Sequence, residues 1–264
     1  MDTFVAITFG LLSITAHELG HYEAMRRCHI RIKEISLLGF PIPFLPSIYI
    51  KIKNTTWSVH PFIIGAYVEQ YSNDKTESKR LWDQLYINGN GPIANIVYAL
   101  ILLAIAVGIK GIRTGQIEKA GIVLLTTGGI ACLLWLGRRY IALVLPVLTI
   151  PILILVGDAI LSVNPMEAIE SGPGGPIALI EFLAGAETIE GALLLAASLS
   201  IGLGIVNLSP LNPLDGGHIL GAVLKTWFGE KFKNVHNWIT TPLFIVIVVY
   251  SLGLDVVRIW KWIW

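Results

Sequence analysis

Long apolar stretches separated by short polar connections make up most of this chain. A helix needs roughly 20 apolar residues to cross a bilayer, and six stretches approach that length. They occupy residues 3–16, 92–109, 120–136, 140–156, 191–206 and 240–254. The pattern predicts a polytopic α-helical membrane protein with about six transmembrane helices.

The segment from about residue 30 to 70 follows a different pattern. Isoleucine, valine and tyrosine recur in short runs, which are separated by glycine, by proline and by Asn54-Thr55. This alternation is typical of short strands joined by turns. Open strand edges are tolerated at membrane depth only where protein or a cavity covers them. We therefore expect a small membrane-associated β element at the inner membrane face.

The composition agrees with a chain embedded in lipid. Hydrophobic residues make up 54% and charged residues 14% of the 264 residues, whereas a soluble domain carries about 25% charged residues. We expect one membrane domain over residues 1–264, with a core at 1–109 and 170–225 and an extra helical pair at about 110–160. The net charge of +1 and the lack of a long basic tract give no indication of a nucleic-acid partner.

The distribution of basic residues predicts the orientation in the membrane. If the N-terminus lies outside and each apolar stretch crosses once, most of the 19 Lys and Arg residues fall in inside connections. The segment 158–190 then lies outside, and it contains acidic residues but no Lys or Arg. Basic residues concentrate on the cytoplasmic side of membrane proteins, so we expect an outside N-terminus in a prokaryotic cell membrane.

The first apolar stretch ends in the motif His17-Glu18-Leu19-Gly20-His21. Residues four apart share one face of a helix, so the two imidazoles can converge on one ion. Zinc favours nitrogen ligands, and a catalytic zinc keeps one position open for water. Glu18 is offset around the helix and can take a proton from that water. The motif therefore predicts a zinc site with Glu18 as the general base.

The position of this motif along the helix indicates how deep it lies in the membrane. Thr3 and His17 are separated by roughly 21 Å of helix, within a hydrocarbon core about 30 Å thick. Arg26 and Arg27 follow and mark the inner interface. Ionisable residues at such a depth are costly and usually mark a functional site. We expect the site to lie toward the cytoplasmic side.

A second polar cluster, NLSPLNPLDGGHIL at residues 207–220, offers a third ligand. Pro210 and Pro213 interrupt the preceding helix, and Asp215 follows them. The first and fifth apolar stretches run in the same direction across the membrane, so both polar clusters lie near the inner side. This shared depth predicts that Asp215 joins the two histidines of the first helix.

Three motifs together resemble the site-2 protease family of intramembrane metalloproteases, peptidase family M50. They are HELGH in the first helix, GPIAN at residues 91–95 and NLSPLNPLDGG at residues 207–217. LLGFP, GAYVEQ and GPGGPIALIEF, which starts at Gly172, resemble further family segments. The resemblance implies a zinc ion bound by His17, His21 and Asp215, with Glu18 as the base.

The resemblance also implies roles in substrate handling. Asn207 would orient substrate or stabilise the oxyanion, which an amide N–H can do; capping of the broken helix is its alternative role. Asn95, Pro210 and Pro213 are candidates for substrate binding, with packing as the alternative for Asn95. The strand region at about residues 48–52 could pair with an unwound substrate by strand addition.

The expected function is hydrolysis of peptide bonds within transmembrane segments of membrane proteins or residual signal peptides. The expected partners are such a transmembrane substrate and the lipid bilayer, and no PDZ or CBS domain is apparent in the sequence. Two alternatives stay open: a polytopic metal-ion transporter, and a catalytically inactive membrane scaffold. Glu18 distinguishes them, because neither alternative needs a general base beside the metal.

Overall fold

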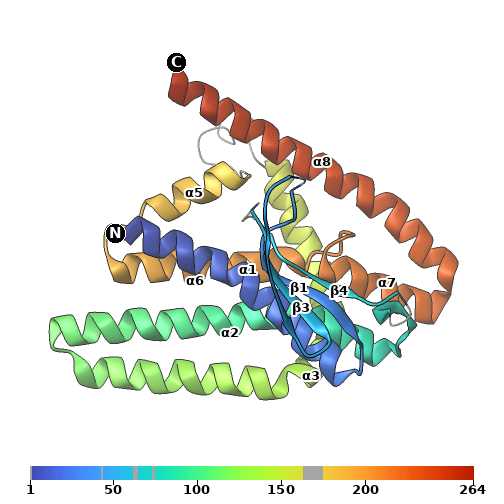
Figure 1. Ribbon diagram of the computed structural model, residues 1–264, viewed down its shortest axis with the longest axis horizontal. Coiled ribbons are helices and arrows are strands. Elements are labelled where there is room, and N and C mark those ends of the chain that lie inside the picture. Colours follow the sequence, from blue (N-terminus) through green and yellow to red (C-terminus); the bar gives the residue numbers. More distant parts are fainter. Residues whose placement is uncertain (1, 43, 62–64, 73–74, 163–174) are drawn as a thin grey trace.

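The computed structural model of the chain describes residues 2–42, 44–61, 65–72, 75–162 and 175–264 (Figure 1). It is mainly helical, with a small sheet after the first helix. In chain order the elements are α1 (Asp2–Arg27), β1 (Ile32–Leu38), β2 (Ile48–Ile52), β3 (Thr55–Val59), β4 (Tyr67–Gln70), a 3-10 turn η1 (Thr76–Ser78), α2 (Leu81–Thr114), α3 (Ile117–Ser162), α5 (Pro176–Ala184), α6 (Ile189–Asn207), α7 (Asp215–Phe228) and α8 (Glu230–Ile263).

Among the described residues, five helices are long and apolar enough to cross a membrane. They are α1, α2, the part of α3 up to Val147, α6 and α8. This finding confirms the prediction of a polytopic helical membrane protein. In Figure 1, α1 and α6 run in the same direction and α2 runs opposite to them, so the first and fifth predicted stretches are parallel, as expected.

One part of the helix prediction was wrong. The stretches 120–136 and 140–156 were expected to be separate helices joined at Arg138 and Arg139, but both lie in the unbroken α3. Arg138 is only 3% exposed, and its guanidinium donates to Glu23 of α1 at 2.9 Å. Because this charge is paired inside the protein, it does not have to reach water.

Small residues allow α1 to pack closely against its neighbours. Its buried positions recur at helical spacing, and they are Ala6, Gly10, Ser13, Thr15, His17, Gly20, His21, Ala24 and Met25. A Cβ atom on Gly20 would lie 2.5 Å from the Asn90 carbonyl oxygen and 2.8 Å from the Ala94 Cβ atom of α2. Small residues are what permit such close approach between membrane helices.

Helix α6 packs on the same part of α2. The Ser200 hydroxyl donates to the Asn95 carbonyl oxygen at 2.9 Å, and a Cβ atom on Gly204 would lie 3.1 Å from the Pro92 carbonyl oxygen. Helix α2 therefore contacts both α1 and α6 around the GPIAN segment. This arrangement places GPIAN next to the histidines of α1.

The predicted β element is a four-stranded sheet in the order β2-β3-β1-β4. Strands β1 and β3 are parallel, whereas the other two pairs are antiparallel. The Thr15 hydroxyl of α1 donates to the Leu37 carbonyl oxygen, which docks β1 two residues before His17. All five residues of the edge strand β2 are exposed. Residues 172–174 of the predicted glycine-rich segment lie outside the described residues.

A carboxylate holds the sheet together from within. The Glu34 carboxylate of β1 accepts hydrogen bonds from the Ser58 hydroxyl at 2.5 Å and the Tyr67 hydroxyl at 2.9 Å, and His60 Nε2 lies 3.3 Å from it. Burial by itself raises the pKa of Glu34, but hydrogen bonds from Ser58, Tyr67 and His60 outweigh it and lower the pKa from its ordinary value. The ionised carboxylate is therefore the form that the folded sheet favours.

We expect Glu34→Ala to destabilise the sheet by about 1–3 kcal/mol, because it leaves buried donors without an acceptor. The wild-type stabilisation should be present above the unfolded-state pKa and lost as the pH falls through the lower folded-state pKa. Thermal unfolding in detergent across this pH range measures both effects. Glu69→Ala is the control, because the Lys33–Glu69 pair is exposed and such pairs contribute about 0–1 kcal/mol. Equal losses in the two variants would contradict the assignment.

We expect Gly20→Leu to force α1 away from α2, because its side chain would meet the Asn90 backbone. Overpacking of this kind typically costs about 1–3 kcal/mol. Gly128→Leu on α3 is the matched control, since no described atom lies within 4 Å of a Cβ atom there. Thermal unfolding of both variants in detergent tests the prediction, and an unchanged Gly20→Leu variant would disprove the close crossing.

Candidate metal centre

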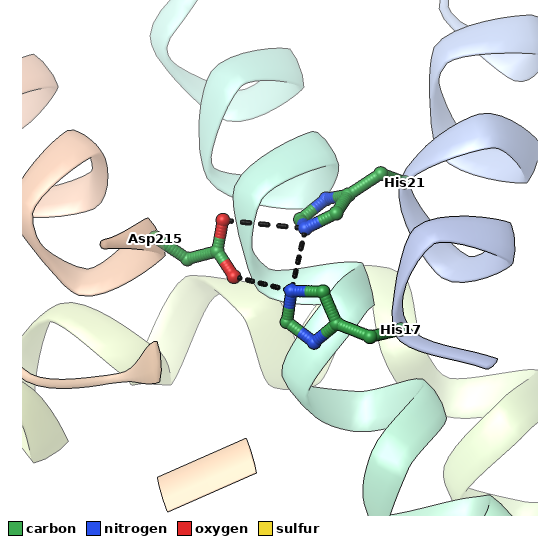
Figure 2. Close-up of side chains that lie close together, drawn as sticks. All are labelled: His17, His21 and Asp215. Atoms are coloured by element: carbon green, nitrogen blue, oxygen red, sulfur yellow. Dashed lines mark hydrogen bonds and ion pairs between the residues drawn. The ribbon is translucent and has the colours of Figure 1, made fainter. Parts of the chain in front are cut away.

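Two histidines of α1 and one aspartate of α7 point toward one another (Figure 2). His17 Nε2 lies 3.0 Å from Asp215 Oδ2, and His21 Nε2 lies 3.2 Å from Asp215 Oδ1. The two Nε2 atoms are 3.0 Å apart. The helical spacing of four residues places both imidazoles on one face of α1. The structure thus brings together the three residues that the sequence predicted as metal ligands.

The hydrogen bond of His21 to α2 determines which ring nitrogen carries the proton and which one has a lone pair. Its Nδ1 atom lies 2.8 Å from the Ile87 carbonyl oxygen of α2. A carbonyl oxygen can only accept, so Nδ1 carries the proton and Nε2 of the neutral ring has the lone pair. This is the usual arrangement of a metal-ligating histidine, in which the second nitrogen donates to an outer partner.

The environment of the Asp215 carboxylate also fits a cation. Asp215 Oδ2 is buried and has no hydrogen-bond partner of acceptable geometry among the described residues, although His17 Nε2 lies 3.0 Å away. Two imidazole nitrogens and a carboxylate oxygen match the N/O ligand set of zinc, and a catalytic zinc has three protein ligands. The donor set therefore fits a catalytic zinc ion.

Gly91 of α2 leaves space beside the ligands. A Cβ atom at this position would lie 2.3 Å from His21 Nε2 and 2.8 Å from His17 Cε1. A side chain at this position would therefore press on both imidazole rings. The sequence analysis noted Gly91 as part of GPIAN but did not assign it to the site; its signal was a glycine in the interior of an apolar helix.

The local sequence of the 208–214 connection determines where Asp215 lies. A Cβ atom on Gly216 would lie 2.1 Å from the Leu208 carbonyl oxygen, and one on Gly217 would lie 2.6 Å from the Asn212 nitrogen. The connection can fold back on the first turn of α7 only because both residues are glycine. Asp215 is the first residue of α7, where the positive end of the helix dipole favours a carboxylate.

Helix α8 holds this connection from the other side. His236 donates through Nε2 to the Pro210 carbonyl oxygen at 3.0 Å. The Asn212 backbone nitrogen donates to the Thr240 hydroxyl, and the Asn212 side chain donates to the Thr241 hydroxyl, both at 3.3 Å. Pro210 is buried in this packing, whereas Pro213 is exposed. Substrate binding by the two prolines stays a prediction.

The other predicted site residues, Glu18, Asn207 and Asn95, differ in their surroundings. Glu18 is half-buried on α1 and close enough to His21 for their charges to interact. Asn207 donates from its side-chain amide to the Leu203 carbonyl oxygen at 3.0 Å, one turn back in its own helix. Asn95 is fully buried, and its side-chain amide lies 3.2 Å from His17 Nδ1. The roles assigned to Asn207 and Asn95 in substrate handling stay predictions.

A cavity of about 440 Å³ lies beside the first turns of α7. Its lining includes Gln84 and Asn88 of α2, Gly217 and His218 of α7, and Lys233 and Asn237 of α8. Gly217 and His218 follow Asp215 within one turn. The cavity therefore lies near Asp215 in the chain, at the end of the molecule at which α7 and α8 meet, although Asp215 itself does not line it.

Parts of the chain are similar to known metalloproteases. It is 28% identical over 137 residues to a predicted zinc metalloprotease of Neisseria meningitidis, covering 45% of this chain and 29% of the relative. It is 38% identical over 90 residues to a predicted zinc metalloprotease of Helicobacter pylori, covering 32% and 25%. With the metalloprotease MmpA of Caulobacter vibrioides it shares 25% identity over 131 residues, covering 38% and 32%. These matches span about a third or less of the relatives.

A family comparison covers nearly the whole chain. The description of the matching family is peptidase family M50, and the match runs from residue 4 to residue 250. The matched range includes the three predicted ligands and every other predicted site residue. The chain therefore belongs to peptidase family M50, a family of zinc metalloproteases.

Proposed function

We propose that this protein is an intramembrane zinc metalloendopeptidase, which hydrolyses peptide bonds within transmembrane segments of membrane proteins or within residual signal peptides. One observation carries the proposal: His17, His21 and Asp215 converge in a bundle whose helices are long and apolar enough to cross a membrane. Glu18, adjacent to the first ligand, provides a base that an ion carrier would not need. Membership of the M50 family supports the same activity.

The proposal assigns a role to each residue of the centre. His17, His21 and Asp215 would hold the zinc ion, which when bound supplies a Lewis acid that polarises a carbonyl and makes water more acidic. Glu18 would accept a proton from the attacking water and return it to the leaving amine. The Ile87 carbonyl oxygen, which accepts from His21 Nδ1, would keep the ring oriented for metal binding through Nε2. Asn207 would help to orient the substrate or to stabilise the oxyanion.

The substrate must present an extended backbone to this centre. The carbonyl groups of a helix are hydrogen-bonded and shielded, so a transmembrane substrate has to unwind locally before it is cut. Strand β2 pairs with β3 on one side only, and its residues Ile48–Ile52 are exposed. We propose that this edge accepts the unwound segment by strand addition, near the site of cleavage.

Hydrolysis also requires water at membrane depth. The cavity lined by Gly217 and His218 lies next to the first turns of α7, and charged side chains such as Lys233 also line it. We propose that water enters from this side and that this side is cytoplasmic. The basic residues Arg26 and Arg27 at the end of α1 support this orientation, because basic residues concentrate on the cytoplasmic side of membrane proteins. The N-terminus would then lie outside a prokaryotic cell membrane.

We expect Glu18→Gln to retain zinc but to lose cleavage by about 10²–10⁴-fold, because it removes the general base and leaves the ligands in place. The assay is cleavage of a detergent-solubilised transmembrane peptide that contains a Gly-Pro pair, together with zinc content by atomic absorption. Glu187→Gln, in the exposed connection before α6, is the matched control. Wild-type cleavage rates in the Glu18→Gln variant would refute the proposed mechanism, and altered zinc flux without cleavage would favour a transporter.

We expect Asp215→Asn to lower zinc affinity by more than the roughly 10–100-fold that loss of an outer-shell partner costs, since the substitution removes a ligand charge with little change in shape. Competition with a chromophoric chelator measures the affinity. Asp83→Asn, in the first turn of α2, should bind zinc as the wild type does. Unchanged zinc affinity in Asp215→Asn would mean that the metal site lies elsewhere.

A further inference from the structure

Asn95 of α2 is enclosed behind the His17 ring. Its residue surface is 0% exposed, and its side-chain amide is 3.2 Å from His17 Nδ1, the ring nitrogen that does not face Asp215. The Ser200 hydroxyl donates to its backbone carbonyl oxygen, and Gly204 of α6 packs against its Cβ atom. The Asn95 side chain therefore lies against the His17 ring in the interior of the bundle.

The chemistry of His17 determines what Asn95 must offer. When Nε2 of a neutral imidazole binds a metal, Nδ1 carries the proton and needs an acceptor. Asn95 contains one, Oδ1, which is buried and has no hydrogen-bond partner among the described residues. The amide oxygen and nitrogen exchange places by a half-turn of the side chain, and the hydrogen-bond network decides between the two orientations. The orientation with Oδ1 toward His17 satisfies both the ring N–H and the buried oxygen.

We propose that Asn95 is a positioning residue for the metal centre, which accepts a hydrogen bond from His17 Nδ1 through its Oδ1 atom. This proposal rests on the proposed function of His17 as a metal ligand. It gives the two histidines equivalent support from one helix, because His21 Nδ1 already donates to the Ile87 carbonyl oxygen of α2. Helix α2 thus orients both rings, although it supplies no ligand itself.

Two substitutions separate this role from simple packing. Asn95→Leu keeps the size of the side chain but removes the acceptor, so we expect zinc affinity to fall about 10–100-fold. Asn95→Asp keeps an acceptor and cannot donate, so we expect zinc affinity at or above the wild-type value. Ser200→Ala is the matched control, because it removes a buried hydrogen bond to Asn95 without touching His17, and zinc affinity should not change.

The experiment is zinc competition with a chromophoric chelator, with thermal unfolding of each metal-free variant measured alongside. If Asn95→Leu and Asn95→Asp change the unfolding temperature but not the zinc affinity, Asn95 only packs and the proposal is wrong. Equal zinc loss in both variants would show that an acceptor at position 95 does not support His17, which also overturns the proposal. Failure of the proposed metal site is distinguishable, because the wild type and Asp215→Asn would then bind zinc equally weakly.

Discussion

The approach of the Asp215 carboxylate to two imidazoles of α1 is the contact on which the rest of this structure depends. A carboxylate in a largely apolar bundle is costly unless it is paired or binds a cation. The contact requires α1 and the start of α7 to meet to within hydrogen-bonding distance. The surrounding elements therefore have to fix both helices before any chemistry can follow.

Helix α2 meets this requirement on the histidine side. Gly20 of α1 lets the two backbones approach, and Gly91 of α2 leaves open the space beside both rings. The Ile87 carbonyl oxygen and the Asn95 side chain lie at the outer nitrogens of His21 and His17. Helix α2, which supplies none of the three converging side chains, thus contacts the outer nitrogens of both imidazoles, as outer-shell partners do in metal sites generally.

The aspartate side is held by packing of a different kind. Gly216 and Gly217 let the connection after α6 fold against the start of α7, and His236 and Thr240 of α8 bind that connection from outside. On the opposite flank, Thr15 ties the sheet to α1 close to His17. The sheet and the three converging side chains are therefore connected through α1.

Much of this arrangement could be predicted from the sequence, because its causes are local. The spacing of His17 and His21 places two imidazoles on one helix face, the apolar lengths predict membrane helices, and the direction of the stretches places Asp215 at a similar depth. Only the tertiary structure decided that Arg138 stays inside an unbroken α3, since its partner Glu23 belongs to a distant helix. Only it revealed the partners of the outer imidazole nitrogens and the space that Gly91 leaves. The helical repeat determines which side chains of one helix share a face. Contacts between helices depend on the packing of residues that are far apart in the sequence, and the repeat of a single helix does not specify that packing.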